Sequence, residues 1–428
     1  MSATKTGENV NMKKIVLSTL VALSIATVAS ASDVKLYQDA NGQVFTSAAD
    51  GRTEISTNQG VSVNSMTDRL DFSMLAYLGF VNTDYRNAPT AANKVKPDTS
   101  DFEARRMYFQ VKAYLDGSKK DYFRVTYDVY SPSQVSYSGS ATTTSNYYAT
   151  MVKYAYLYLD KILPFTDVEI GQAHTTLLDY EESHSWAYRS FDNVFTEQPN
   201  GPGLNASAGR GIDLKTNTKY FSSEIGVYNN SGYHDPEGTT NNNGMGMDYE
   251  ARLTAHVLGT GTDYNSKHTY FDVSLLGKHN VNATTGITNT ANGANIDYIG
   301  VHSVFNTENF LIAGQYISAP DTTSGADVSA KAGQGYSVNF DARAGEKDQY
   351  HVFGRVDRWT AKLPASSTLS TADKRTYIGG AAWDMNKNVQ WQASVITTDN
   401  QNDKNPTAGK NINLANGNQY MLTAQVSF

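Results

Sequence analysis

The sequence feature that most constrains the fold is a two-residue alternation of apolar and polar side chains, which recurs in sixteen segments. In the last segment, QYMLTAQVSF, the residues Tyr420, Leu422, Ala424, Val426 and Phe428 share one parity and mostly polar residues occupy the other. Successive side chains of a β-strand point to opposite faces, so this pattern predicts a strand with one apolar and one wet face. The sixteen predicted strands are residues 70–84, 103–116, 121–130, 149–160, 166–174, 209–215, 219–229, 247–258, 268–278, 296–306, 309–318, 334–344, 349–360, 374–384, 388–398 and 418–428.

The connections between these segments alternate in length. Short turns such as DGSKK follow every second segment, and long polar connections such as SPSQVSYSGSATTTSN lie between the turns. This rhythm is typical of an all-β transmembrane antiparallel β-barrel with short periplasmic turns and long extracellular loops. With an even number of about 16 strands, the last strand closes against the first and leaves no free sheet edge. We therefore expect Phe428 to contribute to barrel closure and assembly.

Composition agrees with a barrel. After residue 31 no run of 18 apolar residues occurs, which excludes transmembrane helices from that part, whereas barrel strands need only about 9–11 residues each. The sequence contains 28 Tyr, 16 Phe and no cysteine. Without cysteine there are no disulfides and no thiolate metal sites, so strand pairing and burial must stabilise the fold.

The N-terminal 31 residues predict a leader. A basic start at residues 12–14, an apolar stretch over 15–28 and the sequence ASA at 29–31 are typical of a cleaved signal peptide, and residues 1–11 form an upstream extension. A short membrane anchor is the alternative, but the apolar stretch is shorter than the roughly 20 residues of a spanning helix. Cleavage leaves 32 basic and 41 acidic residues, and this net charge of −9 argues against a nucleic-acid partner.

We expect three parts: residues 1–31 as extension and signal peptide, 32–69 as a periplasmic N-terminal extension, and 70–428 as the barrel. In the middle part Asn41-Gly42 predicts a hairpin turn. A loose extension is the alternative. The expected location is the outer membrane of a Gram-negative bacterium, with the lipid bilayer and the outer-membrane assembly machinery as partners.

The alternation also predicts which side chains face the lumen. In RRMYFQVKAYL the residues Met107, Phe109 and Val111 form an apolar face, whereas Arg106 and Lys112 lie on the wet face. A charge facing lipid at mid-depth would cost about 2–4 kcal/mol, so these cations must point inward. The alternative role of such residues is a salt-bridge lattice that stiffens the wall. The predicted pore-lining residues are Arg106, Lys112, Arg124, Asp128, Arg252, Asp341, Arg343, Arg355 and Asp357.

Aromatic residues gather near the ends of predicted strands, for example Tyr77, Tyr154 and Tyr228. Rings with one apolar and one polar end suit the headgroup level of a bilayer, so we expect them to form aromatic belts. An ordinary aromatic core is the alternative.

The longest connection, residues 175–208, is richer in aromatic and charged residues than the others. We expect it to fold into the barrel and narrow the lumen, with Arg189 and His184 facing acidic residues. Opposed charges across a constriction set up a transverse field that orders permeating solutes. A loop that stays outside the barrel is the alternative. The predicted constriction residues are Asp179, Glu181, Glu182, His184 and Arg189.

Several stretches resemble one known family. DFEARRMYFQVKAYLDGSKKDYFRVTYDVY and YAYLYLDKILPFTDVEIGQAHTTLLDYEESHSWAYRSFDNVF are similar to segments of the phosphate-selective porin O and P family, and the resemblance extends from about residue 70 to QYMLTAQVSF at the C-terminus. Arg105 and Arg106 match the family's paired arginines, and residues 171–172 match its Gly-Gln. Ala173 and His174 stand where the family tends to have an aromatic residue and a lysine, which counts against phosphate selectivity.

The resemblance implies a sixteen-stranded, trimeric barrel whose third long loop lines a constriction, and a preference for anions such as phosphate. Together with the residue patterns it predicts an outer-membrane porin, a water-filled channel for passive diffusion of small hydrophilic solutes and ions that needs no cofactor.

Two other functions compete with the porin. A surface adhesin or structural outer-membrane protein would use the same barrel to display its loops. An outer-membrane hydrolase would need a catalytic relay, for which Ser183, His184 and Ser185 beside Asp179 are the ingredients. Neighbouring side chains on a strand point opposite ways, so this spacing makes no relay by itself. The sequence has no nucleophile elbow, paired-His metal motif or phosphate-cradling glycine loop, so we expect no enzyme.

Overall fold

The chain forms two compact units, Met1–Asp68 and Arg69–Phe428. The predicted signal peptide lies outside the described residues. The computed structural model describes residues 36–39, 44–45, 48–55, 69–87, 98–130, 148–198, 200–229, 233, 247–260, 267–281, 297–319, 332–362, 371–400 and 416–428.

The first unit contains a small antiparallel sheet with the strand order β2-β1-β3. Strand β1 (Leu36–Asp39) pairs with β2 (Val44–Phe45) on one side and with β3 (Arg52–Ile55) on the other. β1 and β2 flank the Asn41-Gly42 dipeptide, which itself lies outside the described residues.

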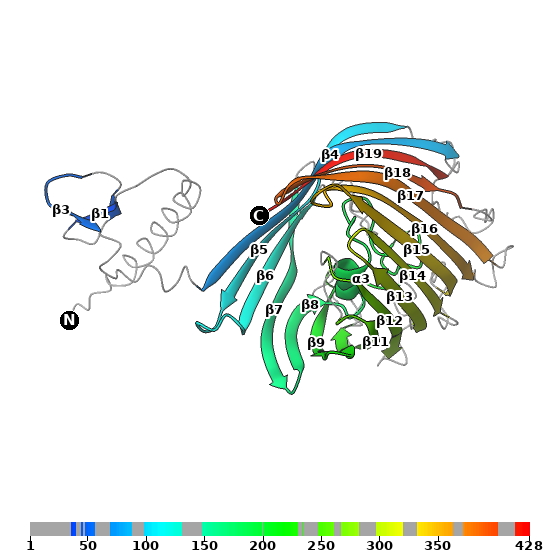
Figure 1. The fold of residues 1–428 in the computed structure, drawn as a ribbon, viewed down its shortest axis with the longest axis horizontal. Helices are drawn as coiled ribbons and strands as arrows, with labels where there is room; N and C mark the ends of the chain where they lie inside the picture. The colour runs from blue at the N-terminus through cyan, green and yellow to red at the C-terminus, as the bar shows by residue number, and fades with distance from the viewer. Residues whose placement is uncertain are drawn as a thin grey trace, which may run out of the picture. The chain divides into compact units, whose positions relative to one another are not determined.

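The second unit is a closed barrel of sixteen antiparallel strands (Figure 1), which confirms the predicted fold class. Each strand pairs with its neighbours in the sequence, and β19 pairs with β4 to close the ring. Closure gives each strand a partner on both sides, which a barrel in lipid requires because hydrocarbon offers no hydrogen-bond partners. The strands are β4 (Leu70–Asn87), β5 (Thr99–Tyr114), β6 (Tyr122–Tyr130), β7 (Ala149–Leu163), β8 (Thr166–His174), β9 (Ala208–Asn217), β10 (Phe221–Asn229), β11 (Met247–Leu258), β12 (Tyr270–Val281), β13 (Tyr298–Asn306), β14 (Phe310–Ala319), β15 (Gly333–Ala344), β16 (Tyr350–Lys362), β17 (Thr371–Asn386), β18 (Val389–Thr398) and β19 (Asn416–Ser427).

Short and long connections alternate around the ring, as the sequence predicts. We call the two ends of the barrel the short-turn end, where β4 begins and β19 ends, and the long-loop end. The short connections are residues 115–121, 164–165, 218–220, 259–269, 307–309, 345–349 and 387–388. The long connections are residues 88–98, 131–148, 175–207, 230–246, 282–297, 320–332, 363–370 and 399–415.

The backbone of Phe428 completes the seam between the last and first barrel strands. Its N–H donates to the Met74 carbonyl at 3.0 Å, and its carbonyl accepts from the Met74 N–H at 2.7 Å. The Phe428 ring is 68% exposed. The residue therefore contributes to closure through its main chain, one position beyond the end of β19.

Side chains alternate between the two faces of the wall. In β11 exposed and buried residues alternate almost from end to end. Leu253 is 52% exposed on the outer face, whereas the adjacent Arg252 is 7% exposed on the inner face. The outer face of β15 likewise carries Val338 and Phe340. Because the sheet is closed, these outward apolar side chains form a surface that suits lipid.

Two register shifts break the single parity that the sequence predicts for β5 and β7. Arg105 is the extra residue in the pairing of β4 with β5, and Lys153 is the extra residue in the pairing of β6 with β7. A bulge of this kind re-aims a side chain. Both Arg105 and Arg106 are largely buried, and Arg105 contacts the buried Met421. The two shifts thus add Arg105 and Lys153 to the inward cations.

The aromatic-belt prediction is wrong for three of its tyrosines. Tyr77, Tyr154 and Tyr228 are each less than 5% exposed and belong to the interior of the barrel. Their parity matches that of inward charged residues, so they line the lumen instead of the headgroup level. Among the described residues no helix is long and apolar enough to cross a membrane.

Candidate channel lumen and constriction

The connection between β8 and β9, residues 175–207, packs against the inside of the barrel wall. It contains the seven-residue helix α3 (Leu178–His184), which lies within the ring of strands (Figure 1). Trp186 and Tyr188, which follow the helix, share an apolar cluster with Phe353 of β16. The Tyr188 and Phe353 rings stack with their centroids 3.7 Å apart. We call this connection the constriction loop.

A second apolar cluster fixes the later part of the constriction loop. Phe195 and Leu204 pack with Ile317 of β14 and Trp359 of β16, and all four are less than 4% exposed. The prediction of a polar and charged lumen is therefore wrong for this part of the wall. Its inward residues are apolar because the loop, and not water, covers them.

Polar contacts hold the constriction loop at several strands. The Tyr180 hydroxyl donates to Asp272 of β12 at 2.8 Å, and the Tyr188 hydroxyl donates to Asp341 of β15 at 3.0 Å. Asn205 bonds the hydroxyl of Tyr298 on β13. Tyr180 also lies against Arg252 of β11, and Ser190 donates to Gln392 of β18, so the loop is attached across β11–β18. We call the inner face of β11–β18 the loop-covered wall.

The predicted constriction residues have partly the expected partners, since Arg189 pairs with the expected Glu182. Arg189 pairs with Glu182 and with Glu197, the latter at 3.0 Å. Asp179 does not face His184, because its carboxylate binds Lys215 at 3.0 Å and lies 3.9 Å from His174. Sequence reasoning missed Glu197, because nothing in the sequence shows that the loop turns back on itself.

Glu181 and His184 point into packed surroundings. Glu181 is 2% exposed and accepts a hydrogen bond from Gln315 of β14. The His184 ring stacks on Tyr180 at 4.2 Å. The expectation that Glu181 faces Arg189 and that His184 faces Asp179 is therefore wrong. The helix directs both of them toward the wall that it covers.

Burial and nearby charges shift the pKa values of the carboxyl groups in the constriction loop. Burial raises the pKa of Glu181 to about 7, and it raises the pKa of Asp192 to about 6 even though the Arg355 guanidinium acts in the opposite direction. For Asp179 burial also acts to raise the pKa, but Lys215 and His174 outweigh it, so the pKa lies below its ordinary value. The Asp179 carboxylate, 43% exposed, is thus the ionised acid that the constriction loop presents to the lumen.

Cations of the loop-covered wall are neutralised by carboxylates. Arg252 binds Glu224 at 3.2 Å, and Lys278 binds Asp248 at 2.7 Å. Arg343 binds Asp341 at 3.0 Å. These contacts fit the salt-bridge lattice that the sequence left open as an alternative.

Arg355 and Asp357 lie between the wall and the constriction loop. Arg355 binds Asp357 at 2.7 Å, donates to the Asn193 carbonyl and stacks over the Trp186 ring. Both charged residues are 2% exposed. The prediction that they line open water is therefore wrong, because the loop covers them.

We call the inner face of β5–β7 the open wall. Most of its cations contact tyrosine rings and form no salt bridge with a carboxylate in the described part of the chain. Arg106 binds the buried Asp128 at 3.5 Å. Among the described residues, Lys112, Arg124 and Lys153 form no salt bridge and lie instead over tyrosine rings. Ring faces attract cations but leave their charge uncompensated. Parity predicts the inward direction of Lys112 and Arg124, whereas Lys153 depends on the register shift.

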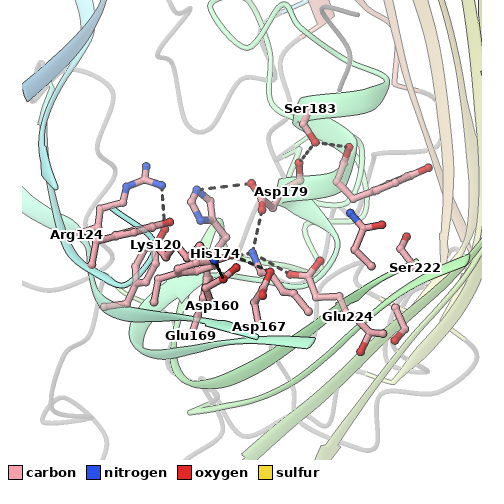
Figure 2. A pocket seen from close by; sticks show the side chains of 18 of the residues that line it. Lys120, Arg124, Asp160, Asp167, Glu169, His174, Asp179, Ser183, Ser222 and Glu224 are labelled. Atoms are coloured by element: carbon pink, nitrogen blue, oxygen red, sulfur yellow. Dashed lines mark hydrogen bonds and ion pairs between the residues drawn. The ribbon is translucent and has the colours of Figure 1, made fainter. Parts of the chain in front are cut away.

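A cavity of about 700 Å³ lies between the open wall and α3 (Figure 2). It extends from Lys120 in a short turn to Asp179 and Ser183 on the helix. Figure 2 shows Arg124 on one side of Asp179 and Glu224 on the other. The cavity therefore has a cationic side and an acidic side, with the ionised loop acid between them.

For the hydrolase alternative, Ser183 contacts His184, but Asp179 does not complete a catalytic relay with them. Ser183 and His184 lie on helix α3, within the segment predicted as a connection, and Ser183 Oγ is 2.8 Å from His184 Nδ1. Ser183 Oγ also lies 2.7 Å from the Asp179 carbonyl, whereas the Asp179 carboxylate is bound to Lys215. In the part of the chain that is described, no group of three or more His, Asp or Glu side chains could hold a metal ion.

Comparison with known proteins relates the chain to solved barrels. No protein-family model matches the chain, and no curated protein matches its sequence. OmpF of Salmonella typhi in complex with daunomycin is 12% identical, with a TM-score of 0.55 over 85% of this chain and 99% of that chain. OprB of Pseudomonas putida is 10% identical, with a TM-score of 0.54 over 85% and 95%. The trimer form of OmpT of Vibrio cholerae is 12% identical, with a TM-score of 0.51 over 84% and 99%.

These likenesses concern the fold. Their identities are far below the level at which function carries over, but each alignment covers most of both chains. By fold, the chain is a closed sixteen-stranded antiparallel β-barrel, like those of outer-membrane proteins.

Proposed function

We propose that the protein is an outer-membrane porin, which lets small hydrophilic solutes and ions diffuse through its lumen. The observation that carries this proposal is the asymmetry of the interior. The constriction loop packs on one wall, and a cavity of about 700 Å³ with charged lining remains beside the other. An interior that was only a packed core would bury its charges in pairs, as the loop-covered wall does.

Anion preference is a finer part of the proposal. It is supported by Lys112 and Arg124 of the open wall, which line the cavity and form no salt bridge among the described residues. Phosphate is the anion that the resemblance to the phosphate-selective porin O and P family names. His174, which stands where that family tends to have a lysine, is the residue that distinguishes this lumen from the expected phosphate site.

A homotrimer, with lipid around it, is the proposed assembly. It is supported by the trimer form of Vibrio cholerae OmpT, a barrel of the same fold. A catalytic role is not proposed, because Asp179, the acid that a relay would need, is bound to Lys215.

Reconstitution in a planar bilayer tests the proposal. The porin should give stepwise conductance, whereas an adhesin or structural barrel should give little. In a salt gradient the reversal potential should indicate anion preference, and Lys112→Glu and Arg124→Glu should each move it toward cation preference. The same gradient with added phosphate tests the finer part. An absence of conductance steps contradicts the porin, and reversal potentials that do not change in either variant contradict the assignment of selectivity to the open wall.

A further inference from the structure

Two like charges on the open wall face each other, and neither forms a salt bridge among the described residues. Lys112 and Arg124 are register partners on β5 and β6, and both line the cavity. Directly opposed like charges destabilise a sheet. Lys112 Nζ lies 4.6 Å from the Tyr122 ring centroid, and Arg124 donates to the Tyr156 hydroxyl at 3.1 Å. Asp71, the other register partner of Lys112, binds a turn lysine instead. This arrangement fits an anionic group that is supplied by a ligand.

A row of rings leads away from this cation pair. Tyr114, Tyr122 and Tyr158 are register partners on three successive strands, and the same row continues with Glu169 and Asp213 on β8 and β9. Tyr122 and Tyr158 are stacked, with their centroids 4.7 Å apart. The row gives the cavity an aromatic floor that ends at carboxylates.

The acidic end of the row has more carboxylate than cation. Lys215 is the ammonium within 4 Å of Glu169, Asp179, Asp213 and Glu224, at distances of 3.3, 3.0, 3.9 and 3.5 Å. Arg252 also binds Glu224, at 3.2 Å, so these two cations serve four acids. Glu169 lines the cavity and is 3% exposed, and its Oε2 has no hydrogen-bond partner among the described residues. A buried carboxylate oxygen without a partner is costly and fits a donor that is supplied by a ligand.

The spacing of the two ends limits the size of such a ligand. Arg124 on β6 and Glu169 on β8 are separated by two strand spacings and by two residues along the strand, or about 12 Å between main chains, and their long side chains shorten this gap. A free amino acid carries both charges on one carbon and is too short to reach from one end to the other. Each residue of an extended peptide adds about 3.5 Å, so two or three residues match the gap.

We propose that the cavity binds short zwitterionic peptides of two or three residues. The peptide carboxylate lies between Lys112 and Arg124, its ammonium bonds Glu169, and its side chains contact the tyrosine row. This inference rests on the proposed porin function, because it names a class of solute for the same lumen.

The test uses the tripeptide Gly-Tyr-Gly in the planar-bilayer experiment on the full-length protein. The free peptide should block the current transiently, and the N-acetylated and C-amidated forms should each block about fivefold more weakly, because each lacks one charge. Lys112→Gln and Glu169→Gln should each weaken the block by a similar factor. Lys267→Gln, which removes a cation from a short turn outside the cavity, is the matched control and should leave it unchanged.

Equal block by all three peptide forms, or block that neither cavity variant weakens, overturns the peptide site and leaves the porin standing. An absence of conductance steps instead overturns the porin. Saturation-transfer NMR from the detergent-folded protein to the tyrosine ring of the peptide measures binding independently of current. The same order of variants and peptide forms is expected there, and no transfer to the free peptide contradicts the inference. Heat-modifiable migration confirms that each variant folds.

Discussion

The open wall and the loop-covered wall are built from the same kind of strand and carry the same kinds of inward cation, but they satisfy those cations in different ways. On the loop-covered wall Lys278 and Arg355 are bound to carboxylates and excluded from water. On the open wall Lys112 and Arg124 lie against tyrosine rings and beside a cavity. The difference follows from the constriction loop, which supplies apolar and polar partners to one wall and leaves Lys112 and Arg124 of the other wall facing the cavity.

This comparison separates the direction of a side chain from its surroundings, which the alternation pattern of a strand does not distinguish. Alternation decides whether a side chain points inward, because successive side chains alternate across the sheet. What an inward side chain meets is decided by which wall the loop covers. Phe353 and Lys112 are both inward, yet Phe353 belongs to a packed cluster and Lys112 to a cavity lining.

The largest expected effect comes from weakening the loop-covered wall. Phe353→Ala removes the ring that stacks on Tyr188 and should cost about 3–5 kcal/mol of packing. With the loop less firmly attached, single-channel conductance should rise and its noise should increase. Phe340→Ala, on the outer face of the adjacent β15, is the control and should leave conductance unchanged. Equal conductance in Phe353→Ala and the wild type would show that the loop does not depend on this cluster.

The same substitution should change stability much more on the loop-covered wall than on the open wall. Lys278→Gln leaves Asp248 and Glu250 buried without their cation and should lower stability by about 3 kcal/mol. Lys112→Gln removes a repulsion with Arg124 and should change stability by less than about 1 kcal/mol. Urea unfolding of the detergent-folded barrels measures both. A loss of comparable size in Lys112→Gln would remove the distinction between the walls.

A smaller effect is expected from pH, through the constriction loop. Burial raises the pKa of Glu181 to about 7, above the usual value of its unfolded state, so the packed loop binds this proton more tightly than the free loop. Packing of the loop is therefore favoured at low pH and weakens as pH rises through about 7. Current noise should increase between pH 5.5 and 8 in the wild type and should increase less in Glu181→Gln, in which Asp192, with a pKa raised to about 6, is the loop acid that still titrates in this range. Asp116→Asn, in a short turn, serves as the control and should retain the wild-type response.

The smallest effect is expected at the seam between the last and first barrel strands. Deleting Phe428 removes its two backbone bonds to Met74, worth about 1–3 kcal/mol together, and should lower the fraction of heat-modifiable barrel. Phe428→Ala keeps both bonds and should fold normally in detergent. Assembly of Phe428→Ala that fails in cells but succeeds in detergent would assign the exposed ring to recognition by the assembly machinery.

Much of the fold could be predicted from the sequence because lipid and water impose a strict parity on barrel strands. The strand at 166–174 has its predicted bounds, and the last strand differs from its predicted bounds by two residues at its start and one at its end. The constriction could not be resolved in the same way. Which carboxylates bind Arg189 depends on how the loop folds back on itself. Residues 175–207 show no regular alternation of apolar and polar residues from which this path could be predicted. The register shifts at Arg105 and Lys153 could not be predicted from the sequence either, because an extra residue in a strand does not change its composition.

The most direct test of the open wall is the accessibility of single cysteines, which the cysteine-free sequence makes unambiguous. Lys112→Cys and Phe109→Cys lie on the same strand with opposite parity, since Lys112 lines the cavity and Phe109 is 43% exposed on the outer face. In reconstituted vesicles a charged thiol reagent should modify Lys112→Cys quickly and reduce its conductance, and it should leave Phe109→Cys largely unmodified. Fast modification of Phe109→Cys together with protection of Lys112→Cys would contradict a hydrated lumen along this wall.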